Sequence, residues 1–121
     1  MKDITSALPR VIADHVAAYN SHDADALMAT FASDALVNDI KREFLGHAAI
    51  RAWADKEIFG DNVTLEVQRA YEHHGDVISH CRASGDFDKT NLPDPLILTY
   101  YFSIRNDRIT QLIIIHNVVV A

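Results

Sequence analysis

The apolar periodicity of this sequence changes once, near its middle, from helical to strand-like. In residues 4–20 the apolar side chains recur every three or four positions, as they do on one face of a helix. From residue 63 onward the pattern alternates, which is typical of strands that bury one face. Helices followed by a run of strands predict an α+β domain with a mostly antiparallel sheet.

Turn signals divide this pattern into elements. The first helix covers residues 4–20, and Asp23 caps a short second helix that carries Phe31 inward. A third helix covers residues 47–59 and ends at Gly60. The final strand is apolar on both faces, which favours a central position or a dimer interface. The expected strands are residues 35–40, 63–73, 77–87, 96–105 and 109–120.

The number of helices limits how the sheet can be covered. Three helices cannot cover a long curved sheet laid flat, so the sheet must wrap around them. A wrapped sheet leaves a cavity on its concave side, and such a cavity is the default ligand site of a small domain. The chain has 121 residues, which suits a single domain over residues 1–121.

Charge and composition exclude several classes of function. The net charge of −6 disfavours broad nucleic-acid binding and binding to an anionic membrane surface. No apolar run approaches the ~20 residues that span a bilayer. The single cysteine, Cys81, and the absence of a signal-peptide pattern favour the cytoplasm. No metal-ligand spacing or phosphate loop is present, so neither a metal nor an organic cofactor is expected.

Three stretches carry a resemblance to a known family. They are residues 16–27 (VAAYNSHDADAL), residues 31–39 (FASDALVND) and residues 46–53 (GHAAIRAW). In this order they resemble the NTF2-like superfamily, which includes SnoaL-like polyketide cyclases and ketosteroid isomerases. The resemblance covers nearly the whole chain and implies a cone, with three N-terminal helices on a curved sheet around a pocket. It is specific for fold and not for function, because this scaffold hosts isomerases, dehydratases, cyclases, epoxide hydrolases and non-enzymatic binders.

The resemblance points to two candidate catalytic residues. Asp39 falls where ketosteroid isomerases place their general-base carboxylate; the alternative is a strand-end aspartate in water. His15 takes the position of the isomerase's hydrogen-bonding tyrosine, where an imidazole can donate to an oxyanion. The alternative for His15, which lies on the apolar face of its helix, is a core histidine bonded to a neighbouring group.

Four further residues are candidates for contact with the ligand. Tyr100 replaces the protonated aspartate that is the isomerase's second oxyanion donor, and this change argues against steroid isomerisation itself. His116 is a polar residue in the most apolar stretch of the chain, and the last strand of the family contributes to the pocket floor. For both residues a place in the core is the alternative. Tyr19 and Trp53 lie on the apolar faces of the first and third helices.

His80 and Arg82 receive conflicting predictions. Alternation in their strand favours burial of the opposite face, with Val77, Ser79 and Cys81, and leaves His80 and Arg82 in solvent. The resemblance instead points them inward, where Arg82 would need a carboxylate partner or an anionic ligand.

Together these features predict a small-molecule protein with a polar site in an apolar pocket. The first hypothesis is a cofactor-independent isomerase, dehydratase or cyclase that transfers a proton next to a carbonyl. The second is a module of the same fold that binds a small organic molecule without chemistry. The third is an interaction protein that uses its sheet face. A homodimer that pairs through the sheet is also expected.

Overall fold

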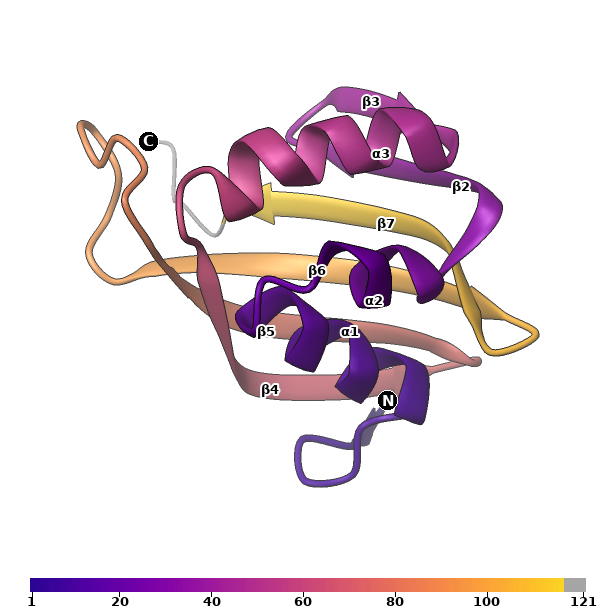
Figure 1. The fold of residues 1–121 in the computed structure, drawn as a ribbon. Coiled ribbons are helices and arrows are strands. Elements are labelled where there is room, and N and C mark those ends of the chain that lie inside the picture. Colours follow the sequence, from indigo (N-terminus) through magenta and orange to yellow (C-terminus); the bar gives the residue numbers. More distant parts are fainter. Residues whose placement is uncertain (117–121) are drawn as a thin grey trace.

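Helices cover one face of a single curved sheet. The computed structural model describes residues 1–116. Seven strands are joined in the order β1-β4-β5-β6-β7-β2-β3, and Figure 1 shows α1, α2 and α3 on the same side of this sheet. The predicted α+β cone with a mostly antiparallel sheet is confirmed. The elements are β1 (Lys2–Asp3), α1 (Arg10–Asn20), α2 (Ala24–Ala29), β2 (Phe31–Asp39), β3 (Arg42–Leu45), α3 (Gly46–Ala54), the π-helical turn η1 (Asp55–Phe59), β4 (Thr64–His73), β5 (Asp76–Ser84), β6 (Leu96–Arg105) and β7 (Arg108–His116).

The first helix begins six residues later than predicted. Pro9 adopts an extended conformation and precedes the helix, and its carbonyl accepts from the N–H groups of Ile12 and Ala13. Proline also favours an extended conformation in the residue before it, which ends the helical pattern on that side. The residues upstream instead form β1, which pairs antiparallel with β4 at the edge of the sheet.

Phe31 belongs to a strand and not to the second helix. Asp23 caps α2 as predicted, accepting from the N–H of Ala26, but α2 ends at Ala29. β2 then begins at Phe31, and its pairing with β7 shifts register between Phe31 and Leu36. This irregularity explains why alternation did not reveal the first half of the strand.

The third helix closes with a wide turn that requires glycine. The N–H of Gly60 donates to the carbonyl of Asp55, five residues back. A methyl group at position 60 would overlap the carbonyl oxygen of Lys56. The wide turn carries Glu57 and Ile58 toward the cavity described below.

Gly60→Ala is therefore expected to lower the free energy of unfolding by about 2 kcal/mol, because overpacking against backbone cannot relax through a rotamer change. Urea unfolding followed by circular dichroism measures this change. Gly75→Ala is the matched control, since a methyl group there meets no atom within 4 Å and only the positive φ opposes it. Equal losses in the two variants would show that the overlap is not the cause.

The second half of the chain is an antiparallel meander of four long strands. β5 ends at Ser84, three residues earlier than predicted, and a long loop joins it to β6. β7 is followed by residues 117–120, the predicted end of that strand, which lie outside the described residues. β7 lies between β6 and β2, pairing in parallel with β2, so its expected central position is confirmed.

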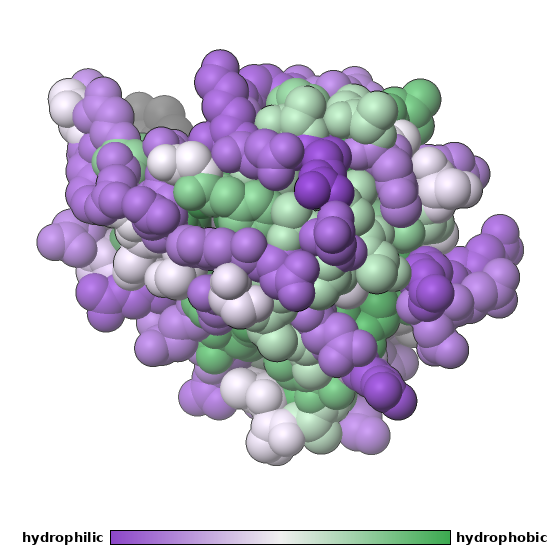
Figure 2. Space-filling model, in the orientation of Figure 1, coloured by the Kyte–Doolittle hydropathy of each residue, from purple (hydrophilic) through white to green (hydrophobic). Residues whose placement is uncertain are grey.

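The core fills the space between the helices and the concave face of the sheet. Its fully buried members include Ile12, Leu27, Ile50, Ile109 and Leu112. Hydrophilic side chains surround a smaller apolar area on the helical face of the molecule (Figure 2). Among residues 1–116, no helix is long and apolar enough to cross a membrane.

Candidate functional site

A cavity of about 250 Å³ opens where β2 and β7 end and the β5–β6 loop begins. Five of the eight predicted site residues line it, although they come from five different elements. They are Tyr19 on α1, Asp39 on β2, Trp53 on α3, Tyr100 on β6 and His116 on β7. Its other lining residues include Arg42, Glu57, Asp61, Phe87, Asp88 and Leu92.

Two donors hold one oxygen of Asp39. Its Oδ2 accepts from Nε1 of Trp53 at 3.0 Å and from Nη2 of Arg42 at 2.7 Å. The side chain is 15% exposed, so Asp39 is not a strand-end aspartate in open water. Arg42 reaches it because β2 and β3 form a tight hairpin in which Asp39 and Arg42 are directly opposite.

Arg42 joins Asp39 to a second carboxylate. Its Nη1 and Nη2 donate to the two oxygens of Glu57 at 3.0 and 2.7 Å. The hydrogen bonds to Glu57 are the largest cause of a raised pKa of the Arg42 guanidinium, and Asp39 adds to this shift. The positive charge of Arg42 is therefore neutralised by protein groups on both sides.

Tyr19 and Tyr100 place two phenol groups in the cavity wall. Both are almost fully buried, at 4% and 2% exposure. Burial is the main cause that raises the pKa of each hydroxyl, and the two hydroxyls also interact with each other. The charge of Asp39 contributes to both pKa shifts. The phenols thus stay protonated near neutral pH beside the carboxylate. Because one hydroxyl donates to the other, one O–H group of the pair remains to donate to a ligand.

His15 lies in the core behind Tyr19. Its ring makes edge contacts with Phe31 and Phe102, with centroids 5.3 and 5.4 Å away. Its Nδ1 is 2.9 Å from Oγ1 of Thr30, and that hydroxyl donates to the carbonyl of Leu27. The hydroxyl of Thr30 has a single proton, which it gives to Leu27, so it can only accept from His15. The Nδ1 atom of His15 must therefore carry the proton, which selects the Nδ1–H tautomer. Burial lowers the pKa of His15 to about 3, so the ring is neutral near pH 7.

His80 and Arg82 lie on the outer face of the sheet. Val77, Ser79, Cys81 and Ala83 are buried on the inner face of β5, as alternation predicts. His80 is half-buried and bonds to Oγ1 of Thr99 at 3.1 Å, whereas Arg82 is exposed. Neither residue is brought to Asp39, in contrast to the inward placement that the resemblance implies.

Sequence reasoning missed four charged groups of the cavity, which are Arg42, Glu57, Asp61 and Asp88. Glu57 follows Trp53 by four residues, a spacing that puts both on one helical face and could have revealed it. Arg42 had no comparable signal, because its role depends on a hairpin at Ile40 and Lys41 that contains no glycine. Both turn residues have positive φ, which non-glycine residues rarely adopt.

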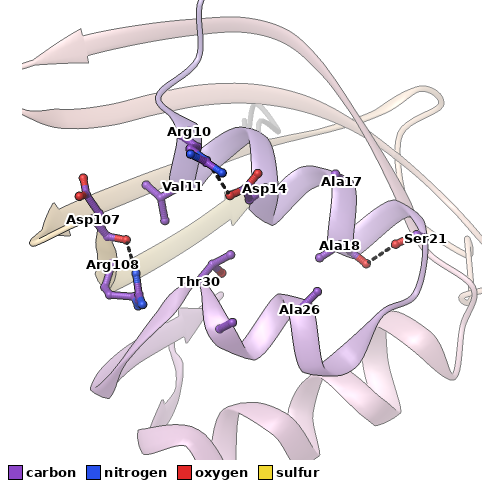
Figure 3. A pocket seen from close by; sticks show the side chains of 11 residues that line it. Arg10, Val11, Asp14, Ala17, Ala18, Ser21, Ala26, Thr30, Asp107 and Arg108 are labelled. Carbon is purple, nitrogen blue, oxygen red and sulfur yellow. Dashed lines mark hydrogen bonds and ion pairs between the residues drawn. The ribbon is translucent and has the colours of Figure 1, made fainter.

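A larger groove lies between α1 and α2, away from Asp39. It measures about 840 Å³, and Figure 3 shows its alanine-rich floor and its charged rim. On that rim Arg10 faces Asp14 at 3.8 Å, and Arg108 donates to the carbonyl of Asp107. These charged groups lie on the exposed rim, whereas the cavity at Asp39 brings together five of the predicted site residues, so we place the candidate site at Asp39. Among the described residues, no group of three or more histidine, cysteine or acidic side chains is arranged to hold a metal ion.

Comparison with known proteins agrees with this fold. The profile of the SnoaL-like domain family matches residues 12–112. A candidate polyketide cyclase from Sinorhizobium meliloti is similar in structure, with 29% identity, a TM-score of 0.82 and coverage of 92% of this chain and 98% of that chain.

More distant structures share only the fold. A hypothetical protein from Catenulispora acidiphila with a ketosteroid isomerase-like fold, in complex with trimethylamine, has 22% identity and a TM-score of 0.73 over 88% of this chain and 85% of that chain. A candidate ketosteroid isomerase from Kribbella flavida has 9% identity and a TM-score of 0.75 over 92% and 78% of the two chains. No curated protein matches this chain significantly.

Proposed function

This chain belongs to the SnoaL-like domain family, and we propose that it catalyses proton transfer next to a carbonyl of a small organic molecule. The observation that supports this proposal is the carboxylate of Asp39 beside two protonated phenols in one cavity. A base and an oxyanion donor in the same site are the two requirements of enolate chemistry.

The proposed chemistry starts at Asp39. Both donors to Asp39 use Oδ2, so we assign proton abstraction to Oδ1. As the C–H bond breaks, its electrons form the enolate double bond and the carbonyl pair moves onto oxygen. A hydrogen bond from one phenol of the Tyr19–Tyr100 pair stabilises that oxyanion while the other phenol donates to the first, a role for which His15 was the sequence-based candidate. Return of the proton from Asp39 to another carbon gives isomerisation, and its transfer to a β-hydroxyl that leaves as water gives dehydration. Attack of the enolate carbon on a second carbonyl, whose oxygen takes up the proton, gives cyclisation.

A non-catalytic binding protein is the second candidate. The observation that favours it is the ion pair of Asp39 with Arg42, which already neutralises the carboxylate. In that case the phenols and Asp39 orient the polar end of a ligand and no bond is broken.

One experiment separates the two candidates. The protein is incubated in D₂O with small cyclic ketones, enones and lactones, and loss of the α-proton signal is followed by NMR. Thermal shift is measured on the same panel. We expect compounds that raise Tm to exchange faster with protein than in buffer. Stabilisation without faster exchange would establish the binding protein instead, and neither effect would contradict both candidates.

We also propose that the chain forms a homodimer through the outer face of the sheet. Ile78, Tyr101 and Ile113 are in direct register on that face of β5, β6 and β7. Tyr101 and Ile115 are 38% and 40% exposed, which is unusual for large apolar residues in the middle of a sheet.

Tyr101→Glu is expected to convert this dimer to a monomer, because a charge cannot be desolvated at the centre of an apolar interface. Sedimentation velocity at two protein concentrations measures the change. Ala13→Glu adds the same charge to the exposed face of α1, on the opposite side of the sheet, and should leave the dimer intact. A wild-type protein that sediments as a monomer at both concentrations would refute the homodimer.

The cytoplasm is the location we propose. The one cysteine, Cys81, is buried in the core as a free thiol, where it forms no disulfide within the described residues. Such cysteine usage is usual in a reducing compartment.

A further inference from the structure

A second cavity lies against the Asp39 cavity, beside the β5–β6 loop. It measures about 400 Å³. Its lining includes Lys89 and Asp94 from the loop, and Arg82, which leaves the end of β5 on the outer face and belongs to the exposed rim of the cavity. The rest of its wall is largely apolar and includes Ala83, Phe87, Leu92, Pro93, Pro95 and Leu96. A cationic end and an apolar floor in one hollow suit an amphiphilic anion.

The two cations are available to a ligand. Within residues 1–116, Arg82 forms no ion pair, although Glu66 is opposite it on β4. The ammonium of Lys89 is held in place by the carbonyl of Gly85 at 2.6 Å and lies 5.3 Å from the centre of the Phe87 ring. Neither of these contacts neutralises its charge.

The two cavities are adjacent and share part of their walls. Ala83, Phe87, Leu92 and Leu96 line both of them. Phe87 and Leu92 are half-buried and belong to the loop between β5 and β6, where no ladder hydrogen bonds fix the backbone. A ligand that occupies both cavities would require these two side chains to change rotamer.

Charge sets the direction in which a ligand can lie across the two cavities. The first cavity is lined by four carboxylates, Asp39, Glu57, Asp61 and Asp88, and its arginine is already paired with two of them. An anionic group is disfavoured there by like charge. The second cavity has an excess of positive charge, so the anionic end of a ligand belongs in it.

We propose that the ligand is an elongated carbonyl compound with an anionic tail, and that Arg82 and Lys89 bind this tail in the second cavity. The inference rests on the proposed function in one respect, the placement of the polar head at Asp39. The tail is a carboxylate or a group of similar charge, and it determines specificity without taking part in the chemistry.

The anion site is tested with a matched pair of fluorescent probes. Anilinonaphthalene sulfonate and N-phenylnaphthylamine share one aromatic skeleton, and only the first is an anion. We expect Arg82→Ala and Lys89→Ala each to weaken binding of the sulfonate by roughly tenfold and to leave binding of the neutral probe unchanged. Arg105→Ala removes an exposed cation at the other end of β6 and is the control. Unchanged affinity for the sulfonate in both test variants, or no binding to wild type, would overturn the proposal.

The connection between the cavities is tested with 6-(naphthalen-2-yl)-6-oxohexanoate and its methyl ester. Trp53 is the only tryptophan of the chain and donates to Asp39, so its emission reports on the first cavity. We expect the acid to displace the sulfonate probe and to change Trp53 emission, and the ester to be the weaker competitor. Displacement without any change in Trp53 emission, or equal competition by the ester, would refute a ligand that spans both cavities.

These tests are independent of turnover. If the chain proves to be a binding protein, the effects of Arg82→Ala and Lys89→Ala on the probes should persist. If the chain is an enzyme that lacks the proposed anion site, α-proton exchange of neutral ketones persists. Arg82→Ala and Lys89→Ala then do not weaken binding of the anionic probe relative to the neutral probe.

Discussion

Asp39→Asn should slow protein-dependent α-proton exchange by about 10²–10⁴-fold, the usual contribution of a general base. Asparagine has nearly the same shape and keeps an oxygen that can accept from Trp53, but it cannot take up a proton. The loss should therefore fall on the rate of exchange and not on folding. NMR exchange rates in D₂O and the Tm of the variant measure these two quantities.

Asp34→Asn is the matched control for this variant. Asp34 lies on the same strand but is exposed, and its replacement removes the same charge. Its exchange rate should stay at the wild-type value. If Asp39→Asn also exchanges at the wild-type rate while it still binds the ketone, Asp39 is not the base.

Acid should destabilise the fold strongly through His15. Burial lowers the pKa of this imidazole from 6.5 to about 3. Between these two values the unfolded chain binds a proton that the folded chain does not bind. The contribution of His15 to the free energy of unfolding is therefore complete above pH 6.5 and declines as the pH falls toward 3. Linkage gives a loss of roughly 2.5 kcal/mol between pH 7 and pH 4.5.

His15→Gln isolates this contribution. Glutamine can still donate to Thr30 but does not titrate, so the variant should be less stable at pH 7 and should lose less stability on acidification. Urea unfolding at pH 7, 5.5 and 4.5 measures both effects. Parallel pH dependences of the two proteins would assign acid sensitivity to other groups.

The local sequence pattern correctly predicted the placement of those site residues whose position depends on a single helix or strand. Helical spacing placed Tyr19 and Trp53 on buried faces, and both line the cavity. Alternation along β5 correctly predicted that Arg82 is exposed on the outer face of the sheet, whereas the family resemblance predicted that it points inward. The resemblance directed attention to Asp39 and Tyr100, which no periodicity could single out.

The remaining features depend on contacts between distant segments. The pairing of Arg42 with Glu57 joins residues of different elements, and no local pattern encodes which carboxylate an arginine will choose. Phe31 looked helical because it continues the apolar spacing of α2. Its strand conformation results from pairing with Ile109 near the other end of the chain.

That parallel pairing of β2 with β7 has a consequence for the order of folding. Asp39 is opposite Ile114, and the N–H of Ile40 donates to the carbonyl of Ile114, so the base is anchored by a contact that closes a very long loop. The meander from β4 to β7 needs only contacts between neighbouring strands, which carry a smaller entropic cost. The binding site should thus be among the last parts of the molecule to form during folding. A partly folded chain can already have most of its sheet and still lack a place for the ligand.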